Sequence, residues 1–187
     1  MNMILFNEQE QFFFPTNDER AQHIIHILKK KPGDVFEAGI ENAQAGQAKI
    51  TAIDETGIYF DFEKTGDGKP ANPIELIIGF VRPIQLKRIF RDIAGLGVQK
   101  VHLVATELGE KSYMNSKIAE RGTAHAALRD GAMQAMSTHI PELVIHDCLE
   151  KCLNKLHTQD KLCMPVCLDT AQANISFTEY LLQKKIF

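Results

Sequence analysis

The stretch Ile74-Glu75-Leu76-Ile77-Ile78-Gly79-Phe80-Val81 is followed by a helical pattern over Ile84–Ala94 and by a second apolar stretch, Val98–Thr106. The first and last of these segments are short and rich in apolar residues, which favours strands buried on both faces. Between them the apolar side chains recur at the i, i+3, i+4, i+7 spacing of one helix face, at Leu86, Ile89, Phe90 and Ile93. A strand, a crossover helix and a second strand predict a parallel pair.

The same alternation continues to the end of the chain. We expect a long helix over Ser116–Thr138, a third strand at Leu143–His146, a helix over Cys148–His157 and a fourth strand at Met164–Leu168. Ser176 and Glu179 match a capping box, which predicts a last helix that runs to about Lys185. The pattern therefore predicts that residues 74–187 form an α/β domain with a mainly parallel sheet.

The first 70 residues have a different pattern. Short apolar runs separated by turn residues predict strands at Met3–Phe6, Gln11–Phe14, Val35–Ala38, Gln47–Ile53 and Gly57–Phe62. One helix is expected over Asp18–Lys31, where Pro32-Gly33-Asp34 ends it. Residues 1–70 thus predict a small β-barrel. Lys64–Pro73, which holds two Gly and two Pro, is the expected linker to the second domain.

Composition excludes several classes of protein. The chain has 187 residues, of which 44% are hydrophobic and 24% charged, so it is neither collagen-like nor wholly disordered. Its apolar runs are shorter than the ~20 residues of a membrane span, and the first residues lack the pattern of a secretory signal. We therefore expect a cytoplasmic protein. The net charge is −3, so any nucleic-acid contact must come from a local cationic patch.

Two cationic groups follow the first two predicted strands of the second domain. In open α/β sheets ligands bind at the carboxyl ends of the strands, where the sequence places Arg82 and then Glu107, Lys111, Ser112 and Tyr113. These groups would suit phosphate contacts and base stacking. Lys87, Arg88 and Arg91 follow on the outer face of the helix, and an ordinary solvated face is the alternative for these three.

Cysteines and histidines allow a weaker hypothesis. Cys148-x3-Cys152 and Cys163-x3-Cys167, with His146 and His157 nearby, could hold zinc, but the expected spacing on a turn is usually Cys-x2-Cys. We expect buried, reduced thiols and no metal. His23 and His26, beside an apolar stripe, are expected to be structural.

Three motifs, in this order, resemble those of one known family. They are His23-Ile24-x-x-Ile27-Leu28-Lys29 with Pro32-Gly33-Asp34, then Gly95-Leu96-Gly97-Val98 with a strand ending in Thr106-Glu107, and then Gln134 with Pro141-Glu142-Leu143. The chain resembles the ribosomal RNA small subunit methyltransferase E family, SPOUT-class enzymes that methylate N3 of a uridine in 16S rRNA. It departs from the family's motifs at Gly95, Leu108-Gly109, Met133 and Ser137.

The resemblance implies a PUA-like RNA-binding barrel and a SPOUT-type domain that uses S-adenosylmethionine. It also implies small-subunit rRNA as the partner and a homodimer for the complete protein. Arg82, Lys87, Arg88, Lys111 and Ser112 are the expected RNA contacts, with Gln134 in support, while the catalytic and cofactor-binding residues stay unassigned. The alternative is a non-enzymatic RNA- or ribosome-binding protein.

The family continues with a Gly-Pro-Glu-Gly-Gly loop and a Leu-Gly-x-Arg-Ile-Leu-Arg segment that form a trefoil knot. The knot binds the cofactor and makes much of the dimer interface, and this sequence stops before both motifs. We therefore expect an incomplete SPOUT-type domain, as a fragment or as a naturally shortened protein. As it stands, the chain is expected to be inactive and to bind little S-adenosylmethionine.

Overall fold

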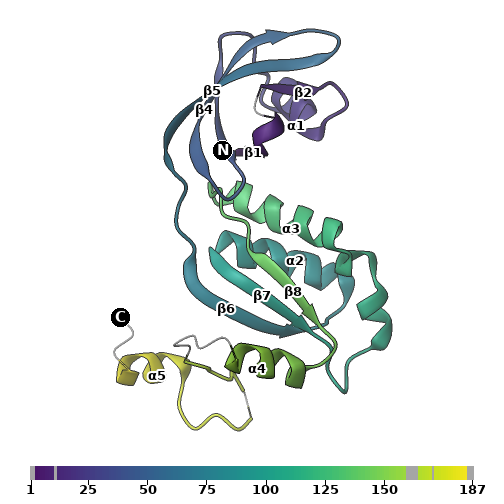
Figure 1. Cartoon of the computed structure of the whole chain (residues 1–187), viewed down its shortest axis with the longest axis vertical. Helices are drawn as coiled ribbons and strands as arrows, with labels where there is room; N and C mark the ends of the chain where they lie inside the picture. The colour runs from purple at the N-terminus through teal and green to yellow at the C-terminus, as the bar shows by residue number, and fades with distance from the viewer. Residues whose placement is uncertain (1–2, 11, 159–163, 170, 185–187) are drawn as a thin grey trace. The chain divides into compact units, whose positions relative to one another are not determined.

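The computed structural model describes residues 3–10, 12–158, 164–169 and 171–184, and its fold is mixed α/β, as predicted (Figure 1). The chain divides into two compact units, Met1–Cys152 and Leu153–Phe187. The first unit holds two sheets, which follow one another along the chain. No helix in the described residues is long and apolar enough to span a membrane.

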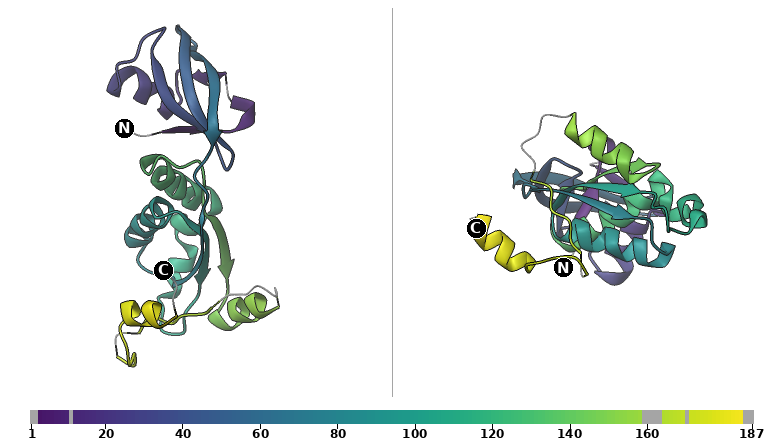
Figure 2. Two further views of the ribbon diagram at one scale, coloured as in Figure 1. Left: turned by 90° about the vertical axis from the view of Figure 1, so that its left-hand side faces the viewer. Right: turned by 90° about the horizontal axis from the view of Figure 1, so that it is seen from below.

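The N-terminal sheet has five strands in the order β1-β3-β4-β5-β2, and it curls around its own core (Figure 2). Its strands are β1 (Ile4–Phe6), β2 (Phe13–Pro15), β3 (Val35–Ile40), β4 (Gln44–Ile53) and β5 (Gly57–Asp67). β1 runs parallel to β3, and the other neighbours are antiparallel. The predicted β-rich N-terminal module is therefore confirmed.

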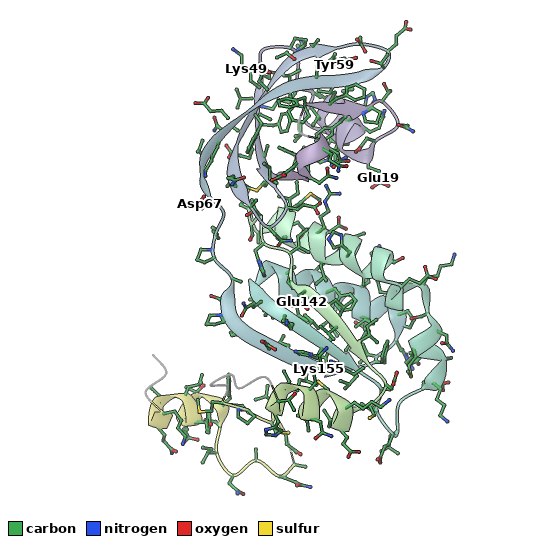
Figure 3. The ribbon with its side chains drawn as sticks, in the orientation of Figure 1. Glu19, Lys49, Tyr59, Asp67, Glu142 and Lys155 are labelled. Atoms are coloured by element: carbon green, nitrogen blue, oxygen red, sulfur yellow. The ribbon has the colours of Figure 1, made fainter. Side chains whose placement is uncertain are left out.

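Aromatic rings fill the core of this sheet. Along β5, Ile58 and Phe60 are buried while Tyr59, which Figure 3 labels, and Asp61 are exposed, which is the alternation expected of a half-buried strand. Phe60 lies at the centre, because its ring centroid is 4.7 Å from that of Phe14, 5.7 Å from Phe6 and 5.8 Å from Phe36.

Two predicted boundaries in this region are wrong. The helix expected over Asp18–Lys31 is α1 (Glu19–Gln22) followed by a π-helical turn, His23–Ile27, and it ends at Leu28 because Lys29 adopts a left-handed φ of 53°. The expected linker begins later than predicted. β5 continues to Asp67, since Gly66 and Asp67 still pair with Ala45 and Gln44 of β4.

Arg20 ties α1 to the core of the sheet. Its guanidinium donates to Glu10 and Asp18 and lies 4.2 Å from the centre of the Phe14 ring. The bonds from Arg20 hold the pKa of Glu10 below its usual range. Burial raises the pKa of Asp18, but the side-chain and backbone hydrogen bonds of Arg20 lower it by more, so the net shift is downward. The network therefore favours the charged carboxylates.

The second sheet is parallel, with the order β6-β7-β8, from β6 (Asn72–Gly79), β7 (Val98–Val104) and β8 (Glu142–His146). The helices α2 (Pro83–Gly95) and α3 (Arg121–Gln134) connect these strands and pack together on one face of the sheet (Figure 2). A short 3₁₀ helix, Lys111–Asn115, and a second one, Lys117–Ala119, precede α3. The two further helices are α4 (Leu149–His157) and α5 (Phe177–Lys184).

Gly131 explains how closely α2 and α3 approach. A Cβ atom built on Gly131 would lie 2.2 Å from the backbone oxygen of Arg91. Any side chain at this position would push the two helices apart. The capping box that opens α5 is also confirmed, since Glu179 N donates to Ser176 Oγ at 3.2 Å and Ser176 N donates to Glu179 Oε2 at 2.9 Å.

Three predictions for the α/β region are wrong. β6 is not buried on both faces, because Ile74 and Ile77 are 48% and 37% exposed on what is an edge strand of the described sheet. The long helix expected from Ser116 begins only at Arg121, since Ser116 and Glu120 have extended backbone angles. Met164–Leu168 lies in the described residues but forms no strand there, although its apolar composition suits one.

Candidate functional site

The carboxyl ends of β6, β7 and β8 lie along one edge of the parallel sheet, which we call the carboxyl edge. The strand ladder continues one residue further, since Phe80 N donates to Val104 O at 3.1 Å and Ala105 N donates to His146 O at 3.2 Å. A Cβ atom on Gly79 would lie 2.9 Å from Thr106 Cγ2. The loops that follow β6 and β7, residues 80–82 and 105–110, therefore start side by side, as the sequence predicts.

Arg82 forms the N-cap of α2 at this edge. Its backbone is extended, with φ −49° and ψ 135°, and Pro83 follows at the first helical position, where its fixed φ suits the helix. Arg82 makes no side-chain capping bond, and its side chain is exposed. Its guanidinium is therefore exposed to solvent at the end of the loop that follows β6.

Lys111 and Ser112 lie in the 3₁₀ helix that ends the second loop, and both are exposed. The carboxylate of Glu110 accepts a hydrogen bond from Ser112 N at 3.4 Å, which fixes the start of this turn. Tyr113 is half-buried and packs against the α/β core. Tyr113 is therefore less exposed than Lys111 and Ser112.

The remaining cationic side chains of α2 differ among themselves. Lys87 and Arg88 are exposed, whereas Leu86 and Phe90 of the same helix are buried. Arg91 forms an ion pair with Asp130 of α3, with Nη2 and Oδ2 2.9 Å apart and both side chains about two-fifths exposed. Arg91 thus joins the two helices, and Lys87 and Arg88 face solvent.

Gln134 is not brought together with Arg82 and Lys111. It ends α3, which leads into the amino end of β8, marked by Glu142 in Figure 3. It lines an open depression of about 500 Å³ together with Gly95 and Leu96, which lead into the amino end of β7. Because parallel strands have all their amino ends at one edge, Gln134 lies at the edge opposite the cationic loops.

The depression beside Gln134 includes neither Arg82 nor Lys111. A second depression, of about 340 Å³, is lined by residues 42–44, 67–71 and 138–139. Neither this depression nor the one beside Gln134 includes any residue of the two cationic loops. Neither depression therefore places a cofactor pocket beside Arg82 and Lys111.

Sequence reasoning considered His146 and Cys152 as possible zinc ligands, but it missed the cluster that these two residues form with Glu75 and His102. His102 Nδ1 lies 3.0 Å from His146 Nε2, and His102 Nε2 lies 2.9 Å from Glu75 Oε2. The available signal was a polar residue with an apolar neighbour on each side in two strands, Glu75 between Ile74 and Leu76 in β6 and His102 between Val101 and Leu103 in β7. The sheet register brings these residues to one face, which the sequence alone does not give.

Comparisons with known proteins support one family. The sequence pattern described as the RNA methyltransferase PUA domain matches residues 16–63, and that of the RNA methyltransferase domain matches residues 68–186. The chain is 39% identical over 152 residues to ribosomal RNA small subunit methyltransferase E of Treponema pallidum, with 79% of this chain and 57% of that protein covered. It is 34% identical over 162 residues to ribosomal RNA small subunit methyltransferase E 1 of Borreliella burgdorferi, with 86% and 68% covered.

A solved structure shows the same fold. Ribosomal RNA small subunit methyltransferase E from Neisseria gonorrhoeae, bound to S-adenosyl methionine, superposes with a TM-score of 0.58 at 16% identity. The match covers 79% of this chain and 62% of that one. The chain thus spans about three-fifths of the length of the Treponema and Neisseria proteins. On its sequence matches, the chain belongs to the ribosomal RNA small subunit methyltransferase E family.

Proposed function

We propose that this protein takes part in methylation of small-subunit ribosomal RNA and that the carboxyl edge of its parallel sheet faces the RNA. One observation carries the proposal: exposed Arg82 ends the loop after β6, exposed Lys111 directly follows the loop after β7, and these two loops start side by side at this edge. Arginine and lysine are the side chains that most often contact phosphate, and such contacts position a nucleic acid without reading its sequence. We include Lys87, Arg88 and Ser112, which are also exposed, in the proposed RNA-binding surface.

The domain division that we propose is a PUA-like barrel over residues 1–70 and a SPOUT-type domain over residues 74–187. The two family matches, 16–63 and 68–186, support this division. In the proposed arrangement the barrel holds rRNA while the cationic loops position the strand that carries the target base. The charge of the whole chain, −3, makes a local patch necessary for this contact.

The reaction that we propose is transfer of a methyl group to N3 of a uridine. S-adenosylmethionine is the proposed donor, and the Neisseria structure, which holds that molecule, supports the choice. Uridine N3 must lose a proton, so cationic groups near the uracil oxygens would stabilise the charge that develops there. We also propose a homodimer for the complete protein and action in the cytoplasm.

A methyl-transfer assay tests the reaction. Small-subunit RNA is incubated with labelled S-adenosylmethionine and with the longest protein that contains these residues, and the modified nucleoside is identified by mass spectrometry. Label on uridine N3 is the expected result. Label on another position would contradict the uridine-N3 assignment, while RNA binding without any transfer would favour the non-enzymatic RNA-binding alternative.

A further inference from the structure

We propose that His102, His146 and Cys152 bind one transition-metal ion, with zinc as the best match. The three side chains come from β7, β8 and α4, and their ligand atoms all lie within 4.8 Å of one another. The proposal is independent of the RNA-binding function proposed above. The His102 side chain lies on the face of the sheet opposite α2 and α3. Its two neighbours in β7, Val101 and Leu103, belong to the core that those helices cover, and successive residues of a strand point to opposite faces.

The distances suit a tetrahedral metal site. His102 Nδ1 and His146 Nε2 are 3.0 Å apart. Two imidazole nitrogens that each lie ~2.0–2.1 Å from a zinc ion are separated by about 3.3 Å in a tetrahedron. A movement of a few tenths of an ångström would therefore admit the ion between the two rings, and the Cys152 sulfur is close enough to complete a three-ligand set.

Glu75 also supports the proposed metal site, because it contacts the His102 ring nitrogen that does not face His146. Its Oε2 lies 2.9 Å from His102 Nε2, and its side chain is 13% exposed. A carboxylate can only accept here, so the proton of the imidazole sits on Nε2 and the lone pair of Nδ1 points toward His146. Metal-bound histidines characteristically donate their other N–H to a carboxylate in this way.

The burial of the cluster also favours a bound ion. His102 is 3% exposed, His146 8% and Cys152 0%. Two imidazoles and a thiol are nitrogen and sulfur donors of the kind that zinc prefers, and their burial has already removed them from water. The ion would join two strands to α4, with a water molecule in the fourth position. The pattern Cys148-x3-Cys152 suggested a different set, in which both cysteines bind; Cys163 lies outside the described residues.

Metal analysis of the purified 187-residue chain is the first test. Zinc in a one-to-one ratio is expected, and replacing it with Co²⁺ should give the thiolate-to-cobalt charge-transfer absorption of a cysteine ligand. Cys152→Ser should abolish this absorption. Cys148→Ser is the matched control, because Cys148 lies one helical turn earlier and is only half-buried, so the absorption should persist.

Glu75→Gln keeps all three ligands and tests the supporting contact, even if Cys152→Ser does not fold. Zinc titrated into metal-free protein by calorimetry should bind about 10–100-fold more weakly to this variant than to the parent chain. A chain that purifies without metal and whose melting temperature does not change with added zinc would overturn the proposal. Loss of the cobalt absorption in Cys148→Ser but not in Cys152→Ser would also overturn it.

Discussion

Replacing Phe60 with alanine is expected to lower the free energy of unfolding of the N-terminal sheet by about 4 kcal/mol. The Phe60 side chain is 1% exposed and touches the rings of Phe6, Phe14 and Phe36, so the variant loses both buried apolar area and three ring contacts. The measurement is hydrogen exchange of the amides in β4 and β5, whose protection should fall about a thousandfold.

The matched control is Phe12→Ala. Phe60 N donates to Phe12 O at 3.2 Å, so Phe12 lies beside Phe60, but its side chain is 61% exposed, so the same change removes little buried area and protection should stay within about tenfold of the parent chain. Equal losses of protection in the two variants would contradict the position assigned to Phe60. If the sheet positions rRNA, Phe60→Ala should also weaken RNA binding at physiological temperature, while Phe12→Ala should not.

The double variant Arg82→Glu/Lys111→Glu should bind small-subunit RNA about a hundredfold more weakly at low salt. Each substitution replaces a cation near phosphate by an anion, so attraction becomes repulsion at two points of one surface. Both side chains are exposed, so the fold should be unaffected. Filter binding over a salt series measures the affinity, and the difference should shrink as salt rises.

Lys69→Glu is the control for this change of charge. Lys69 is exposed and precedes the amino end of β6, so it lies away from the carboxyl edge. Its reversal should leave affinity near that of the parent chain, whereas Arg82→Glu or Lys111→Glu alone should each cost about tenfold. Similar losses for all three single variants would show that overall charge, and no particular surface, governs RNA binding.

Local patterns in the sequence predict much of this fold. The helix over Ile84–Ala94 is confirmed, within one residue at each end, because its apolar spacing and the Pro83 start are local signals. The Ser176–Glu179 capping box is confirmed for the same reason, since its two hydrogen bonds join residues three apart. The order of strands and helices follows from these local periodicities.

Features that depend on neighbours distant in the chain are not predicted. The start of α3 at Arg121 reflects extended backbone at Ser116 and Glu120, which residue composition does not reveal. Gln134 was grouped with the cationic loops because it lies in a family-like motif, but the chain direction of α3 takes it to the other edge. Glu75, His102 and His146 come together only through the register of three parallel strands.

Photo-crosslinking tests most directly whether the carboxyl edge faces RNA. A benzophenone amino acid replaces either Ser112, exposed at the carboxyl edge, or Gln134, exposed at the amino edge, and each protein is irradiated with small-subunit RNA. The proposed orientation predicts crosslinks from position 112 and none above background from position 134. Crosslinks from position 134 with none from position 112 would contradict it.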